Sequence, residues 1–139
     1  MGGAVLLNGG VTVLASGTGE TYSFDNVRTE EDRVSLLAAF GIEVKTEGAE
    51  EENFTMPADL DRVLLGYNEV QKRQGLDIGK YTRKKITRYT YEVTNAKCDA
   101  PVYATLLIYR GRVIGADVAS GDPAGFLLPL TEFGTIAEG

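Results

Sequence analysis

The sequence predicts an α+β domain in which two helices pack on an antiparallel sheet of three to five strands, in the order helix, strand, helix, strand, strand, strand. Three observations lead to this class. Two segments carry apolar residues at helical spacing, three later segments have strand length and strand-type residues, and a two-residue Arg110-Gly111 turn joins the last two of these. Helices and antiparallel strands in such blocks are typical of an α+β layer.

The first helix is predicted over residues 30–40. Thr29 precedes it as an N-cap, and three acids, Glu30, Glu31 and Asp32, fill the first turn, where the helix dipole favours negative charge. Gly41 is expected to end the helix in the left-handed conformation. Residues 42–44 then form a short strand or an extended exit.

The second helix is predicted over residues 58–74, after a strand in which Phe54 and Met56 alternate with polar residues. Pro57, Asp59 and Asp61 are placed in or beside its first turn. Gly66 lies in mid-helix and is interpreted as a point of close packing against another element. Gly75 is the expected stop. The core stripe of this helix consists of Leu60, Val63, Leu64, Tyr67 and Val70.

Three antiparallel strands are predicted over residues 85–94, 102–109 and 112–119. The tight turn between the last two would pair Ile108 with Val113 and Ala104 with Asp117. Asp117 is unusual in so apolar a strand and is expected to cap a neighbouring element or to pair with a base; a functional role is the alternative. Both faces of this hairpin are apolar, so we expect the two helices on one face and a terminal segment or a second copy of the chain on the other. The candidate terminal cover is Phe126, Leu127, Leu128, Leu130 and Phe133.

Residues 1–21 are predicted to be a flexible tail and residues 22–139 a single α+β domain. The tail is apolar and rich in glycine. It is interpreted either as the remnant of an N-terminal anchor or signal, or else as a disordered tail or an added β-strand around Val11–Leu14. Residues 1–20 are expected to be poorly ordered and dispensable for stability.

The composition argues against several chemistries. The chain has no histidine, and Cys98 is its one cysteine, so histidine-based catalytic triads, histidine zinc sites and internal disulfides are excluded. No catalytic, cofactor-binding or metal-binding residue is predicted, and the protein is not expected to be an enzyme.

Half of the basic residues gather within residues 72–88, although the formal net charge is −6. This basic cluster consists of Lys72, Arg73, Lys80, Arg83, Lys84, Lys85 and Arg88. Because nucleic-acid-binding domains usually have a basic total charge, we predict no nucleic-acid partner. The basic cluster is interpreted as structural, offsetting a helix dipole and pairing with the acidic segment 43–52.

A candidate interaction surface is predicted near the C-terminus of the second helix, where five side chains are expected to converge: Tyr67, Asn68, Gln71, Lys72 and Tyr81. The leading hypothesis is a binding or interaction domain without catalytic activity, whose partner is an unknown protein or small ligand. The alternative is a small-ligand-binding protein, or an enzyme that uses carboxylates and tyrosines at this place. A deep pocket lined by these residues would favour the alternative.

Four segments occur in a characteristic order: RVSLLAAFGIEV, YNEVQKRQGLDIGKY, RYTYEVTN and LLIYRGRVIGADVAS. In this order they resemble a family of short domains of unknown function from Gram-positive anaerobic bacteria, over about residues 28–130. Ala116 and Ala119 depart from the family's pattern, which has a glycine and a cysteine there. The resemblance implies an extracytoplasmic, cell-surface or membrane-anchored location, with membrane contact only through a missing N-terminal anchor; a cytoplasmic location is the alternative. It implies no activity.

Overall fold

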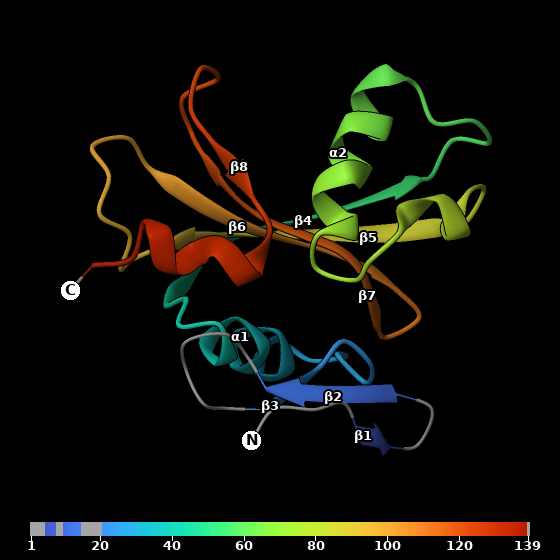
Figure 1. Ribbon diagram of the computed structural model, residues 1–139, viewed down its shortest axis with the longest axis horizontal. Helices are drawn as coiled ribbons and strands as arrows, with labels where there is room; N and C mark the ends of the chain where they lie inside the picture. Colours follow the sequence, from blue (N-terminus) through green and yellow to red (C-terminus); the bar gives the residue numbers. More distant parts are fainter. Residues whose placement is uncertain (1–4, 8–9, 15–20, 139) are drawn as a thin grey trace.

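The computed structural model describes residues 5–7, 10–14 and 21–138. Its main sheet has five antiparallel strands in the order β4 (Val44–Thr55), β5 (Lys85–Val93), β6 (Val102–Tyr109), β7 (Arg112–Ser120) and β8 (Leu127–Leu128). Two α-helices, α1 (Glu30–Ala39) and α2 (Arg62–Lys72), and two 3₁₀ helices, η1 (Ile78–Tyr81) and η2 (Leu130–Thr135), pack around it (Figure 1). The predicted α+β class and element order are therefore confirmed.

Local signals define α1 as predicted. The Thr29 hydroxyl accepts a hydrogen bond from the Asp32 N–H at 3.1 Å, and the Asp32 carboxylate accepts one from the Thr29 N–H at 3.0 Å, which completes a capping box. Gly41 has a φ of 80° just beyond the helix, and the Ile42 N–H reaches back to the Leu37 carbonyl at 3.0 Å. The left-handed glycine thus ends the helix.

α2 begins later than predicted. Asp61 is its N-cap and accepts a hydrogen bond from the Leu64 N–H at 2.8 Å, so Pro57 and Asp59 lie before the helix, outside its first turn. The helix begins after Asp61 because the carboxylate of this residue is placed to accept a hydrogen bond from a free N–H group of the first turn. The C-terminal prediction is correct: Gly75 has a φ of 82°, and the Leu76 N–H bonds the Gln71 carbonyl at 3.0 Å.

The two helices lie on opposite faces of the main sheet, which corrects the prediction of one shared face. α1 packs on the larger core, together with Tyr91 of β5 and Leu106 of β6, whereas α2 packs on a smaller core around Ile86 and Leu107. Figure 1 shows the sheet edge-on between them. Because both faces of the β6–β7 hairpin are apolar, each face needs its own cover, and one helix serves each.

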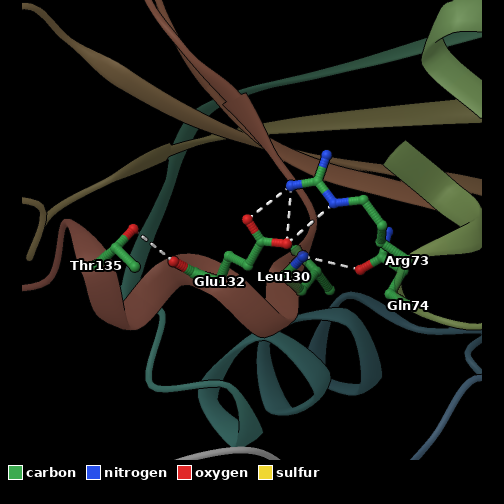
Figure 2. Close-up of polar contacts among 5 residues, drawn as sticks. All are labelled: Arg73, Gln74, Leu130, Glu132 and Thr135. Carbon is green, nitrogen blue, oxygen red and sulfur yellow. Dashed lines mark hydrogen bonds and ion pairs between the residues drawn. The ribbon is translucent and has the colours of Figure 1, made fainter. Parts of the chain in front are cut away.

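The C-terminal segment joins α1 on the larger core. Leu130 and Phe133 of η2 are buried there, as part of the predicted terminal cover, although on the α1 face. Figure 2 shows how η2 is tied to the end of α2. The Arg73 guanidinium forms an ion pair with the Glu132 carboxylate, in which Nη2 donates to Oε1 at 2.6 Å. The Gln74 amide oxygen accepts a hydrogen bond from the Leu130 N–H at 2.8 Å. A second copy of the chain as cover stays a prediction.

A β-bulge changes the predicted register of the hairpin. The turn is as expected, with positive φ at Arg110 and Gly111, and Ile108 pairs with Val113. The register then shifts by one residue between Leu107 and Ile108, so that Asp117 pairs with Thr105 rather than with Ala104. A one-residue shift moves side chains to the other face of a sheet, and bulges commonly re-aim them in this way.

β4 is longer than the sequence suggests. It runs over the acidic segment and forms the exposed edge of the main sheet, with Gly, Ala and Glu at positions where strands usually have β-branched residues. Its pairing partner β5 carries Arg88, which forms an ion pair with Glu52, and Glu92, which pairs with Lys45 at 3.4 Å. The predicted pairing of the acidic segment with the basic cluster is confirmed at Arg88.

The N-terminal region forms a separate three-stranded sheet. β1 (Val5–Leu7) pairs with β2 (Gly10–Leu14), which pairs with β3 (Thr21–Ser23). This agrees with the strand alternative around Val11–Leu14, but the strand is not added to the main sheet. The expectation of poor order for residues 1–4, 8–9 and 15–20 lies outside the described residues, and the boundary at residue 21 and the dispensability of residues 1–20 stay predictions.

Candidate functional site

An apolar groove lies between α2 and the main sheet, with a volume of about 250 Å³. We call it the α2 groove. Its apolar lining comes from Phe54, Met56, Val63, Leu64 and Leu107, and its polar lining from Tyr67, Arg88, Thr105 and Asp117. A mostly apolar hollow with a few polar groups is the usual composition of a small-molecule site.

Asp117 is the buried polar group of the α2 groove. The bulge in β7 turns it to the α2 face, where 4% of its surface is exposed. The Tyr67 hydroxyl donates a hydrogen bond to Asp117 Oδ2 at 2.7 Å. No ion pair to Asp117 occurs among the residues that the structure describes, so the expected pairing with a base is wrong; a tyrosine hydroxyl takes that place.

Burial sets the protonation of this pair. Loss of hydration raises the pKa of Asp117 from 3.8 to about 6, and the Tyr67 hydrogen bond and the charge of Arg88 counteract only part of this rise. Burial, together with the neighbouring carboxylate, raises the pKa of Tyr67 well above 10.0. Near pH 7 the Asp117 carboxyl is therefore mostly ionised while the Tyr67 hydroxyl keeps its proton, and the carboxyl takes up a proton as the pH falls through about 6. Buried groups with such shifted pKa values occur preferentially at functional sites.

The α2 groove continues into a polar hollow of about 360 Å³ on the open part of the same sheet face. Arg88 and Thr105 line both hollows. The second hollow is otherwise lined by Thr90 and by the three consecutive acids Glu50, Glu51 and Glu52. Because Arg88 is paired with Glu52, the net charge of this lining is negative.

The outer surface of α2 is unusually apolar. Val63, at the rim of the α2 groove, is 77% exposed and Leu65 is 54% exposed. Gly66 faces open space, since a Cβ added there would meet no atom within 4 Å. The interpretation of Gly66 as a close-packing point is therefore wrong, and Val63, predicted in the core stripe, lies outside the core because α2 contacts the sheet mainly through Leu64 and Tyr67.

Of the five predicted surface residues, Tyr67 is the one that lines the α2 groove. Asn68 and Gln71 are buried and bond the backbone. The Asn68 amide oxygen accepts the Ile78 N–H at 2.8 Å and its nitrogen donates to Asp77 at 2.8 Å. The Gln71 amide oxygen accepts the Ala116 N–H at 2.7 Å, so it continues the hydrogen bonding of the β7 edge. Both residues hold α2 in place.

Lys72 and Tyr81 lie elsewhere. Lys72 is exposed and pairs with Glu69 at 3.2 Å, one turn earlier on α2. Tyr81 lines a different hollow, between η1 and β7, together with Lys80 and Arg112. The five residues thus do not converge on one pocket. The sequence feature that indicated the α2 groove was Asp117, a carboxylate in an apolar strand. Its orientation depends on a β-bulge, which the local sequence does not predict.

Within ranges 5–7, 10–14 and 21–138, no group of three or more acidic or cysteine side chains is placed to hold a metal ion. No helix in the same ranges has both the length and the apolar character needed to cross a membrane.

These features define a small α+β domain with an apolar groove and one buried, tyrosine-bonded carboxyl. The chain belongs to the family described as a domain of unknown function (DUF4830), whose model matches residues 36–118. This range contains every residue that lines the α2 groove. The expected kinship with a family of unknown function is confirmed at that level. Neither the curated proteins nor the solved structures gave a match to this chain.

Proposed function

We propose that this domain is a non-catalytic binding module that holds an organic cation with an apolar body in the α2 groove. The observation that carries the proposal is Asp117, an ionisable carboxyl buried in an apolar hollow, which forms no ion pair with any of the described residues. Burying an unpaired carboxylate is costly, and a ligand that brings a positive charge would offset that cost.

The surroundings of Asp117 favour a cation over an anion. Among the described residues, Arg88 is the one base that lines the α2 groove, and it forms an ion pair with Glu52. The adjoining hollow adds Glu50 and Glu51. A primary amine or guanidinium at Asp117 would therefore experience a negative field, while Phe54 and Leu107 would contact the apolar part of the ligand. The size of the groove fits a small molecule, or a single side chain of a partner.

Binding of such a cation should depend on pH. The carboxyl of Asp117 must lose its proton before it can form an ion pair, and its pKa is about 6. We expect affinity to be highest above pH 7 and to fall by about tenfold for each pH unit below about 5.5, because protonation then competes directly with the ligand. The chain has no histidine, so no histidine titration overlaps this range.

The experiment is a titration with hexylamine and phenethylamine at pH 7.5, followed by chemical shifts of the α2 and β7 amides. Asp117→Asn keeps an acceptor for the Tyr67 hydroxyl but removes the charge, and we expect it to weaken binding at least about tenfold. Val63→Lys places a positive charge at the rim and should weaken binding similarly. Leu65→Lys is the matched control, since Leu65 lies on the same helix without lining the groove.

Equal losses in Leu65→Lys and Val63→Lys would contradict a site in the α2 groove, as would amine binding that Asp117→Asn leaves unchanged. The same samples test the enzyme alternative, for which a carboxyl with a pKa near neutrality would be suited. Recovery of the amine chemically unchanged supports binding without catalysis, and product signals that vanish in Asp117→Asn would favour an enzyme.

We also propose an extracytoplasmic, membrane-anchored location for the domain, which rests on the sequence resemblance described above. Protease treatment of intact cells that express the full-length tagged protein tests it. Digestion of the domain without cell lysis is the expected result, whereas protection until lysis would place the domain in the cytoplasm.

A further inference from the structure

A second hollow lies on the opposite face of the main sheet and is lined by positive charge. It has a volume of about 210 Å³ and lies where the chain before α1 meets the tip of the β6–β7 hairpin. Its lining includes four basic side chains, Arg28, Arg33, Lys85 and Arg110, and no acidic one. In a chain with a formal net charge of −6, this local arrangement needs an explanation.

Arg33 is the buried member of this group, with 8% of its surface exposed. Its Nε donates to the Tyr91 hydroxyl at 2.8 Å, and its guanidinium lies 3.7 Å from the centre of the Tyr89 ring. No described carboxylate pairs with it, and its two terminal nitrogens have no acceptor in the described part of the chain. The charge of Arg33 contributes to the lowered pKa of Asp32, but the two side chains form no ion pair. The terminal nitrogens are not fully buried, so an anionic ligand in the hollow could accept hydrogen bonds from them.

The other three bases are brought to Arg33 by separate elements. The Val27 N–H bonds the Gly111 carbonyl at 2.8 Å, which fastens the chain before α1 to the hairpin turn. Gly111 has a φ of 80°, and a Cβ there would lie 2.7 Å from the Arg28 guanidinium carbon, so the turn allows Arg28 to approach closely. Arg110, in the same turn, and Lys85, at the start of β5, complete the lining, and none of these bases has an ion pair among the described residues.

We propose that Arg28, Arg33, Lys85 and Arg110 form a binding site for a phosphate group. Four like charges around one hollow repel each other, and a multiply charged anion relieves this repulsion. Guanidinium groups bind phosphate oxygens through paired N–H donors, and a phosphate offers more acceptor oxygens and more negative charge to a group of four bases than a single carboxylate does. The phosphate is carried by a soluble phosphomonoester or by a lipid headgroup, and the two sources share this chemistry.

This site differs from the α2 groove in charge, in face and in chain segments. Arg28 and Arg33 stand in the acidic first part of the chain and Arg110 in a turn, so sequence spacing does not reveal the group. Lys85 belongs to the basic cluster, for which a structural role is predicted from the sequence; in this hollow it has a binding role. The phosphate site shares no residue with the α2 groove.

The test is a titration of the full chain with methyl phosphate at low ionic strength and pH 7.5, read from the amide shifts of residues 27–33 and 108–111. Arg110→Gln and Lys85→Gln each remove an exposed cation without disturbing the core, and we expect each to weaken binding about three- to tenfold. Arg33→Gln should weaken it more than tenfold. If Arg33→Gln fails to fold, the two exposed variants carry the test.

Arg62→Gln is the matched control, because Arg62 is exposed at the start of α2, away from this hollow, and should leave the affinity unchanged. A parallel arm measures sedimentation with phosphatidylcholine vesicles with and without phosphatidic acid. Binding of methyl phosphate identifies a soluble ligand, and binding of phosphatidic acid vesicles alone identifies a headgroup, provided that Arg110→Gln weakens it. Absence of binding in both arms, or equal weakening in Arg62→Gln and Arg110→Gln, would overturn the proposal.

Discussion

Replacing Asp117 with asparagine measures the cost of burying a carboxylate at the base of the α2 groove. In the folded protein the pKa of Asp117 is about 6, against an ordinary value of 3.8. At about 1.4 kcal/mol for each pKa unit, this difference corresponds to at most about 3 kcal/mol. Because the folded pKa is raised, the stability contribution of the proton is complete below about pH 4 and is lost as the pH rises through about 6.

Asparagine keeps an acceptor for the Tyr67 hydroxyl but has no charge to desolvate. Its amide donors cost about 1–3 kcal/mol if they stay unpaired, a term that is constant with pH. The informative quantity is therefore the change with pH in the difference between the unfolding free energies of Asp117→Asn and the wild type. We expect this difference to move by about 2–3 kcal/mol in favour of the variant between pH 4 and pH 8.

Urea unfolding at several pH values, followed by tyrosine fluorescence, gives these free energies, since the chain has seven tyrosines and no tryptophan. Asp99→Asn, at an exposed position, is the control for a general change in net charge. A difference for Asp117→Asn that stays constant within about 0.5 kcal/mol over the whole range would refute the assignment of a raised pKa to Asp117.

Three further substitutions test the account. Gly66→Ala should stabilise the protein by about 0.5–1 kcal/mol, because Gly66 is helical and a Cβ there meets open space; a loss of stability in urea unfolding would show that α2 packs differently. Gln71→Leu should destabilise the protein by about 2–3 kcal/mol, because it leaves the buried Ala116 N–H without an acceptor. Lys72→Leu, at the neighbouring position, should change the stability little. Equal effects of the two substitutions in thermal melts would contradict this role of Gln71. Tyr67→Phe should raise the pKa of Asp117 further, because the hydrogen bond that lowers it is lost; an unchanged or lower pKa in a carboxyl carbon titration would argue against that bond.

The sequence predicted well those features that local interactions decide. Thr29 and Gly41 determine the limits of α1, Gly75 ends α2, and Arg110-Gly111 makes the tight turn, all within a few residues of the signal. The predicted first residue of α2 was a few positions too early. Both Pro57 and Asp61 are typical of helix starts, and only the folded backbone shows that Asp61 is the N-cap.

Features that depend on distant contacts were not predictable in the same way. The two helices lie on opposite faces because β6 and β7 have apolar residues on both faces. The sequence predicted these two apolar faces, but it did not predict which helix covers which face. Asp117 faces Tyr67 because of one bulge residue in β7. Likewise, Arg33 and Arg110 line one hollow because the chain before α1 is hydrogen-bonded to the hairpin turn.

In the function proposed above, the Asp117 carboxyl is the group that recognises a cationic ligand in the α2 groove. The most direct measurement is a carbon-detected pH titration of this carboxyl, without and with saturating hexylamine. We expect a pKa of about 6 without the amine and a pKa at least about one unit lower with it, since an ion pair favours the charged form of the carboxyl. An Asp117 carboxyl whose titration is the same in both samples would contradict the claim.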